Sequence, residues 1–214
     1  MIRRMTSIPD TAIELPGWEL FWARLELAPG AVEELTALRA RVADEARAAL
    51  HVELLAADPT VATVRRLFRA AGCDPTRYRP SSEALLRRIL PGGDLPWISP
   101  LVDLNNCLSV ALRLPCCVVD AASVVPPVVL RAGRAGEVLD SMRGPMDLEG
   151  KPLIADAEGP FGTPISDSHR VKVRPETAEA LLVVYLPAGE VTPARAAETL
   201  DALLAAAPAA RRTA

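Results

Sequence analysis

Three polar side chains stand close together in a mostly apolar stretch, which reads LVDLNNCLSVAL over residues 101–112. Asp103 and Asn106 are three positions apart, so in a helix they share one face, with Asn105 beside them. A carboxamide both donates and accepts hydrogen bonds, which suits the positioning of an ester or of a water molecule. The same groups could instead satisfy backbone atoms where a helix meets a strand. The stretch therefore predicts either a ligand-binding face or a buried structural junction.

A second polar group lies much later in the chain, in the run SDSHR at residues 166–170. Ser168 or His169 could lie at the rim of a pocket, or the serines and the aspartate could cap a turn through bonds to the backbone. Cys117 lies in an apolar segment without a basic neighbour, although a thiolate nucleophile needs a base or a positive field. We interpret Cys117 as a small buried hydrophobe that is a candidate for the pocket wall.

Metal and cofactor chemistry is not indicated. The chain has four cysteines and two histidines without a Cys-x-x-Cys pair, and zinc sites need such clustered ligands. Residues 133–136 have the context of a turn between strands and not of a phosphate-binding loop. The adjacent Cys116 and Cys117 could bridge only with strained geometry. We therefore expect no metal, no cofactor and no disulfide.

The charge distribution bears on nucleic-acid binding. A net charge of −3 argues against a broad phosphate-binding surface, and 4% aromatic residues argue against an extensive base-stacking platform. Residues 61–93 nevertheless carry seven arginines against two carboxylates. These arginines form either an ordinary solvated face or a local patch for RNA phosphates. The candidates for phosphate contacts are Arg65, Arg66, Arg69, Arg87 and Arg88.

Secondary-structure patterns place these side chains in a helical first half and a stranded second half. Ser99 is a suitable cap and Pro100 suits the first helical position, so a helix is predicted to start there and to be ended by Pro115. A short buried strand is predicted at residues 116–119. The other predicted helices cover residues 31–57, 59–72, 82–90 (capped by Ser81 or Ser82) and 193–204, and the other strands cover 18–27, 128–131, 138–142, 152–156 and 180–186.

This order of elements predicts an α+β fold in one domain, residues 1–214. Residues 1–17 are expected to be loosely held, and the alanine-rich tail at 205–214 is expected to fray. The N-terminus lacks the apolar stretch of a secretory signal, and no apolar run is long enough for a bilayer. We therefore expect a soluble cytoplasmic protein without a membrane partner. The oligomeric state is not indicated by the sequence.

The run LVDLNNCLSVALRLPCCVVDAA at residues 101–122 resembles the signature helix and strand of the editing domain of the phenylalanyl-tRNA synthetase beta subunit, the B3/B4 family. Asp103, Asn106, Pro115 and Asp120 fall on the pattern of that family. Residues 76–90 and 162–186 resemble blocks of the free-standing relatives of this domain, and the resemblance is clearest over residues 63–186. It implies a β-sandwich-like core of unusual topology flanked by helices.

The resemblance also implies an activity. In that family the domain hydrolyses tyrosine wrongly attached to the phenylalanine tRNA, and Asn106 matches an asparagine of its pocket. Three departures argue against tyrosine editing by the family's own mechanism. The family's histidine falls on Cys117, its acidic residue for the tyrosine hydroxyl falls on or near Val183, and its arginine falls on Pro96.

Three functions remain open on the sequence. The chain could be an aminoacyl-tRNA deacylase acting in trans, a non-catalytic binder of tRNA or of another partner, or a pocket protein for a small amino-acid-like ligand. In each case the pocket is expected against the face of Asp103 and Asn106. Cys117 and residues 166–169 are expected close by.

Overall fold

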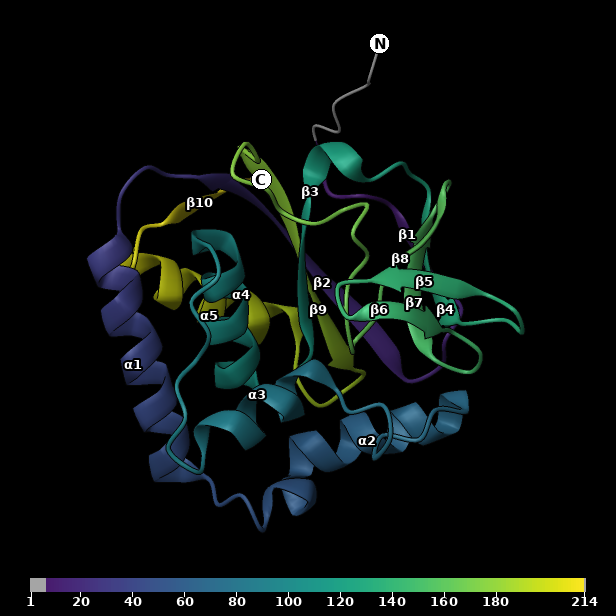
Figure 1. Ribbon diagram of the computed structural model, residues 1–214, viewed down its shortest axis with the longest axis horizontal. Coiled ribbons are helices and arrows are strands. Elements are labelled where there is room, and N and C mark those ends of the chain that lie inside the picture. The colour runs from purple at the N-terminus through teal and green to yellow at the C-terminus, as the bar shows by residue number, and fades with distance from the viewer. Residues whose placement is uncertain (1–6, 214) are drawn as a thin grey trace.

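The computed structural model describes residues 7–213, and it confirms the α+β fold (Figure 1). The helices are α1 (Val32–Ala49), α2 (Pro59–Ala71), α3 (Ser81–Ile89), α4 (Pro100–Leu112) and α5 (Pro193–Ala206). The strands are β1 (Thr11–Ile13), β2 (Trp18–Leu27), β3 (Cys116–Asp120), β4 (Val128–Ala132), β5 (Val138–Ser141), β6 (Gly144–Asp147), β7 (Pro152–Asp156), β8 (Gly159–Gly162), β9 (Glu179–Pro187) and β10 (Ala210–Thr213). Short 3-10 turns occupy Leu55–Ala57 and Ala121–Ser123.

Strand β9 is an inner strand of the central sheet, whose order is β10-β2-β9-β3 with antiparallel pairs throughout. Its residues 180–186 are sealed from solvent, so both faces of the strand are covered. Cys117 pairs with Val183, and Cys116 pairs with Val184. Because side chains alternate along a strand, these two pairs lie on opposite faces of the sheet.

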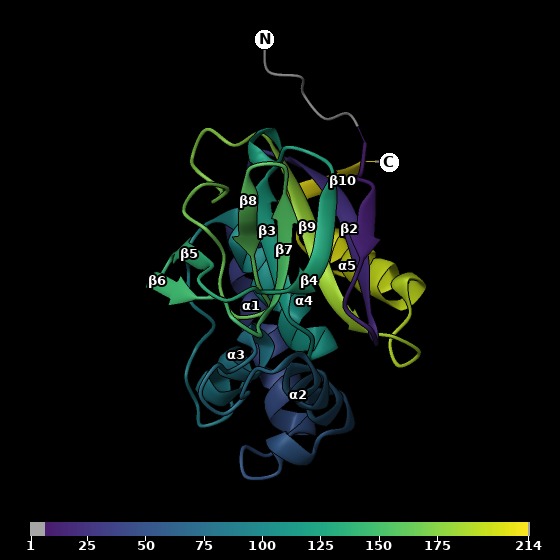
Figure 2. The same cartoon turned by 90° about the vertical axis from the view of Figure 1, so that its right-hand side faces the viewer.

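The two faces of the central sheet are covered differently, as Figures 1 and 2 show. The second sheet, of order β1-β4-β7-β8, packs on one face, and helices α1, α4 and α5 cover the other. Helices α2 and α3 lie below the sheets in both views. The expected β-sandwich-like core with flanking helices is therefore present. One buried apolar cluster extends from Leu15 to Ala210, which supports the single domain that we propose.

Local chemistry explains where α2 begins and ends. The Asp58 carboxylate accepts a hydrogen bond from the Val61 backbone N–H at 3.2 Å, and Pro59 occupies the first turn. Gly72 then ends the helix with φ of 97°, a left-handed conformation that suits glycine. The predicted limits of this helix are confirmed.

Helix α4 begins as predicted but is held differently at both ends. Ser99 is the cap residue, yet its side chain makes no capping bond, and the Asp103 carboxylate instead accepts from the Ile98 backbone N–H at 2.9 Å. The helix ends before Pro115 is reached, because Arg113 adopts a left-handed conformation with φ of 60°. The Ser109 hydroxyl donates to the Leu114 carbonyl at 2.7 Å and secures this end.

The expectation that both ends of the chain are loose is wrong for the residues that the structure describes. Strand β1 pairs in parallel with β4, and Leu15 is buried. Strand β10 pairs with β2 from Ala210 to Thr213, so residues 205–213 do not fray. Backbone pairing at a sheet edge needs little side-chain hydrophobicity, and the composition of these segments therefore did not indicate it. Residues 1–6 and 214 lie outside the described residues.

One helix boundary, one helix cap and two short strands also differ from the predictions. The helix expected over residues 31–57 ends at Ala49 and is followed by the 3-10 turn. Helix α3 has Pro80 at its cap position, and the Ser81 backbone N–H donates to the Pro164 carbonyl at 2.8 Å, so neither serine caps the helix. Strands β6 and β8 were not predicted, because each has only four residues and contains both glycine and proline.

Candidate functional site

A pocket of about 670 Å³ opens where the N-terminal half of α4 meets β3 and the segment after β8. We call it the large pocket. Its wall is mostly apolar, and its polar side chains converge from α4 and from residues 163–174. Its lining comprises Leu27, Ser81, Trp97, Ile98, Ser99, Pro100, Leu101, Val102, Asn105, Asn106, Cys116, Val118, Met142, Thr163, Ile165, Ser166, Asp167, Lys172, Val173, Arg174, Pro175 and Thr177.

Both asparagines of α4 lie in the wall of this pocket. The Asn106 side chain is half-buried and forms no hydrogen bond with any described residue, so its amide is available to a ligand. Asn105 is buried, and its Oδ1 atom is sealed from solvent without a hydrogen-bond partner among residues 7–213. The two amides therefore occupy the position expected from the sequence, and their role stays a prediction.

Asp103 does not line the large pocket, contrary to expectation. Its side chain is fully buried, and burial raises the pKa of its carboxyl group, with the hydrogen bond from Ile98 and the charge of Arg39 opposing the rise. The carboxylate holds the chain just before α4 in place. Asp103 thus shapes the pocket opening without contacting its contents.

Cys117 also lies away from the pocket wall, because Cys116 and Val118 occupy the pocket-facing side of β3. Burial, and then the neighbouring Asp167 carboxyl group, raise the pKa of the Cys117 thiol well above its ordinary value. A thiol in this state is a poor nucleophile. Val183, which pairs with Cys117, is buried and likewise does not line the pocket.

The late polar run reaches the pocket, as expected for residues 166–169, but not through the two candidates singled out in it. Ser166 and Asp167 line it, whereas Ser168 and His169 do not. Ser168 is buried, and its hydroxyl accepts from the Arg170 backbone N–H at 3.1 Å, which is the turn-capping alternative. The His169 backbone N–H donates to the Asp140 carbonyl at 3.0 Å. This segment follows the free edge of β3, so the chain leaves the pocket wall after Asp167 and returns to it at Lys172.

Asp167 lies in the run expected near the pocket, although the sequence did not single it out as a candidate site residue. Its Oδ1 atom is sealed from solvent and has no hydrogen-bond partner among the described residues. Burial raises the pKa of this carboxyl group to about 7, and the Cys117 thiol opposes the rise. Tyr185, on the same face of the sheet as Cys117, has a buried hydroxyl without a partner in residues 7–213. The sequence signal was the single carboxylate of the run SDSHR, placed between two serines.

Two cations also line the large pocket. Arg174 is half-buried, and its guanidinium donates to the carbonyls of Lys172 and His169 at 3.3 and 3.4 Å. Neither Lys172 nor Arg174 has a carboxylate within ion-pair distance in the part of the chain that the structure describes. The pocket therefore combines an apolar wall, amides, one carboxyl group of raised pKa and uncompensated positive charge.

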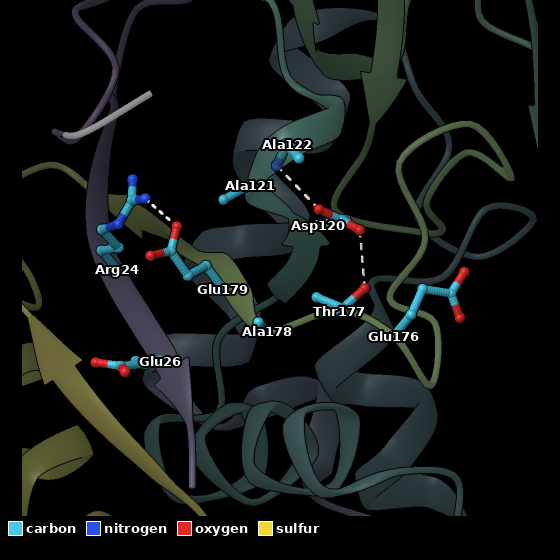
Figure 3. A pocket seen from close by; sticks show the side chains of 9 residues that line it. All are labelled: Arg24, Glu26, Asp120, Ala121, Ala122, Glu176, Thr177, Ala178 and Glu179. Carbon is cyan, nitrogen blue, oxygen red and sulfur yellow. Dashed lines mark hydrogen bonds and ion pairs between the residues drawn. The ribbon is translucent and has the colours of Figure 1, made fainter. Parts of the chain in front are cut away.

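A second, smaller pocket of about 210 Å³ has the opposite charge (Figure 3). It is lined by four carboxylates and one guanidinium, that of Arg24, which pairs with Glu179. Asp120 accepts hydrogen bonds from the Thr177 hydroxyl at 2.8 Å and from the Ala122 backbone N–H at 2.9 Å. These bonds anchor the end of β3 to the segment before β9. An anionic ligand would be repelled here and attracted to the large pocket.

The arginine-rich segment is organised around one buried carboxylate. Glu83 is 1% exposed, and its oxygens lie 2.8 Å from Arg65, 2.9 Å from Arg87 and 3.8 Å from Arg79. We call these four residues the Glu83 cluster. Arg65 and Arg87 are therefore largely committed to the fold. Arg66, Arg69 and Arg88 are exposed and stay candidates for phosphate contacts.

Among residues 7–213, no helix combines the length and the hydropathy that a membrane crossing requires. Within the same residues, no cluster of three or more His, Cys, Asp or Glu side chains is arranged to hold a metal ion. All four cysteines are buried free thiols.

The chain has an α+β fold with a pocket between the N-terminal half of α4 and the edge strand β3. The family model of the B3/4 domain matches residues 63–201, and the chain belongs to this family. This match confirms the resemblance to the B3/B4 family that three blocks of the sequence indicated.

One solved structure is similar over nearly the whole chain. It is the crystal structure of an N-terminal fragment of the phenylalanyl-tRNA synthetase beta-subunit from Pyrococcus horikoshii, at 13% identity and a TM-score of 0.49. The match covers 99% of this chain and 52% of that one, so the chain spans about half the length of the fragment. No curated protein matches the chain.

Replacing Asn106 with Ala should lower ligand affinity or activity more than stability. The half-buried amide has no hydrogen-bond partner among residues 7–213, so we expect the free energy of unfolding to fall by less than about 1 kcal/mol. Ser109→Ala in the same helix is the matched structural control, because it removes a buried hydrogen bond and should cost on the order of 1–2 kcal/mol. Chemical denaturation measures both. A larger stability loss for Asn106→Ala than for Ser109→Ala would show that the amide holds the fold.

Proposed function

We propose that this chain hydrolyses the ester bond of mischarged aminoacyl-tRNA in trans, with the aminoacyl group held in the large pocket. The observation that carries the proposal is the combination, in one pocket, of apolar walls with Asn106, Asp167 and two uncompensated cations. Apolar walls suit an amino-acid side chain, and positive charge suits an RNA end. Membership of the B3/4 family supports a module related to tRNA synthetases.

The proposed reaction is the attack of water on the ester carbonyl carbon. The Asp167 carboxylate accepts a proton from that water as the new C–O bond forms, and the Asn106 amide N–H donates to the developing oxyanion. The bond to the ribose oxygen then breaks, and that oxygen takes the proton back from Asp167. The products are the free amino acid and a tRNA with its terminal hydroxyl restored. A base with a pKa near neutrality is well matched to this task.

The apolar lining favours an apolar amino acid over tyrosine. The family's carboxylate for a phenolic hydroxyl falls near Val183, which is buried in β9 outside the pocket. A phenol would lose its hydrogen bonds to water on entering such a wall. We therefore expect esters of aliphatic or small aromatic residues without a hydroxyl to be preferred.

A second candidate function is non-catalytic binding of a small amino-acid-like ligand. The Glu83 cluster favours it, because the commitment of Arg65 and Arg87 to a buried carboxylate leaves less basic surface for tRNA than the sequence suggests. In that case the pocket would bind the ligand without cleaving an ester.

A deacylation panel with the purified chain separates the two candidates. Mischarged tRNAs carrying different amino acids are incubated with the wild-type chain and with Asn106→Ala, and ester loss is followed over time. The proposal requires faster loss of at least one ester with the wild-type chain than with the variant. If no ester is lost faster than in buffer, but free amino acids raise the thermal unfolding midpoint, the chain is a binder and the hydrolase proposal is wrong.

A further inference from the structure

Trp97 is the exposed member of the three tryptophans, and it stands at the opening of the large pocket. Its relative exposure is 48%, against 3% for Trp18 and 7% for Trp22. Ile98 and Met142 are also exposed and line the same pocket, so the opening has an apolar rim. Large apolar side chains gathered at a pocket opening mark a contact surface, because solvent contact disfavours such a patch.

The Trp97 ring is held in a defined position. The Arg39 guanidinium lies 5.2 Å from the centre of the indole ring, and it also donates to the carbonyl of Leu95. At the next position in the chain, the Ile98 backbone N–H donates a hydrogen bond to the buried Asp103 carboxylate. The loop that carries the ring is thus tied to α1 and to α4. A cation against an aromatic face both fixes the ring and adds positive charge beside it.

The charges near this rim favour an anionic partner. Lys172 and Arg174 line the same pocket, and neither has a carboxylate partner in residues 7–213. Arg39 is engaged with the Leu95 carbonyl and its charge acts on the buried Asp103 carboxyl group, so the unpaired cations of the pocket among residues 7–213 are Lys172 and Arg174. An exposed indole in the same pocket wall as two cations without ion-pair partners in the described part of the chain is the combination that binds a stacked nucleobase and its phosphate. A partner protein would be expected to offer an apolar segment with acidic residues.

We propose that Trp97 is the stacking platform for the unpaired terminal base of an RNA 3′ end, with Lys172 and Arg174 facing its phosphates. The inference rests on the proposed function, since the aminoacyl group attached to that nucleotide is the group that enters the large pocket. The platform holds a single base. It is therefore compatible with the low aromatic content of the chain, 4%.

Tryptophan fluorescence provides a test that does not depend on catalysis. A short RNA ending in CCA, without an amino acid, is titrated into the full chain at low salt, and the emission of the exposed indole is expected to be quenched. Trp97→Phe should keep most of the affinity because it keeps an aromatic face. Trp97→Ala and Trp97→Leu should weaken binding roughly 5- to 100-fold, as expected for loss of one stacked base, with affinity measured by anisotropy of labelled RNA.

The control variants separate RNA stacking from other uses of the rim. Val138→Ala removes an exposed apolar side chain outside the pocket lining and should change affinity less than threefold. Joint replacement of Lys172 and Arg174 by Gln should reduce the salt slope by about 0.7 for each phosphate that the variant no longer neutralises. Equal binding by wild type, Trp97→Ala and Trp97→Leu would overturn the platform. So would Trp97→Leu binding as tightly as Trp97→Phe, because a generic apolar contact, as with a protein partner, would then suffice.

Failure of the platform can be told apart from failure of the proposed function. If the panel shows ester hydrolysis that Trp97→Ala leaves unchanged, the terminal base is bound elsewhere and the platform alone is wrong. If no ester is hydrolysed, the hydrolase proposal is wrong, and the fluorescence titration still decides whether Trp97 binds an RNA end.

Discussion

Replacing Asp167 with Asn is expected to lower the rate of ester hydrolysis by about two to four orders of magnitude, the usual contribution of a general base. The substitution keeps the shape of the side chain and removes its ability to accept the proton. Since Asn106 and the apolar wall are untouched, the KM should change much less than kcat. Wild-type kcat/KM should rise with pH through an inflection near the pKa of about 7, and the variant should lack this inflection.

The same substitution should make the chain more stable at neutral and alkaline pH. The pKa of Asp167 is raised from 3.8 to about 7 in the folded chain, so between these values the unfolded chain loses its proton while the folded chain keeps it. The free energy of unfolding therefore falls as pH rises from about 4 to 7, and Asn removes this loss. Denaturation curves at pH 4 and pH 8 should show that the gain for Asp167→Asn is larger at the higher pH.

Asp140→Asn is the matched control for both measurements, because Asp140 is an exposed carboxylate on the neighbouring β5 that does not line the pocket. It should leave the rate, the pH profile and the stability close to those of the wild-type chain. An Asp167→Asn variant that hydrolyses esters at the wild-type rate, with the inflection preserved, would remove Asp167 from the chemistry. The proton would then have to go to another group.

Replacing Glu83 with Ala is expected to lower the free energy of unfolding by about 3 kcal/mol, because it leaves the guanidiniums of a buried ion pair without a partner. Glu83 is 1% exposed, and the Arg65 side chain is only 13% exposed, so water can compensate little of the loss. Urea denaturation at constant protein concentration measures the difference.

Two arginines of the same helix provide the contrast. Arg87→Ala removes a direct partner of Glu83 at 2.9 Å and should cost more stability than Arg88→Ala, which removes an exposed cation. The order should reverse for tRNA affinity if the exposed face contacts phosphate, with the salt slope falling by about one unit for Arg88→Ala. A loss below about 1 kcal/mol for Glu83→Ala would mean that the Glu83 cluster is solvated and does not support the fold.

The sequence was a good guide to the long elements and a poor one to the short ones. Caps and breakers predicted α2, and hydrophobic runs predicted β2 and β7 with their observed limits. Strands β1 and β10 pair at sheet edges through backbone atoms, so no side-chain pattern predicts them.

The sequence predicted where the candidate site lies, but only some of the residues that line it. Asn105 and Asn106 lie in the pocket wall as expected, whereas Asp103, three positions before Asn106, is bound to the Ile98 backbone instead. Cys117 was wrongly placed in the pocket wall. Side chains alternate between the two faces of a strand, so a shift of one residue moves a side chain from the pocket face to the opposite face. Asp167 was expected near the pocket only as part of the run 166–169, and Trp97 was missed, since burial of a carboxylate and exposure of an indole both depend on contacts between distant segments.

The position of β9 between β2 and β3 also governs when the central sheet can form. Strands β2 and β3 both pair with β9 and not with each other, although β2 precedes it by about 150 residues along the chain. During synthesis the edges of both strands that pair with β9 therefore remain unpaired until residues 179–187 have left the ribosome. Closing such a long loop is slow, and exposed strand edges invite association between chains. We expect nascent chains of this protein to depend on chaperones until β9 is made, and a chain cut before Glu179 to aggregate instead of forming a smaller folded unit.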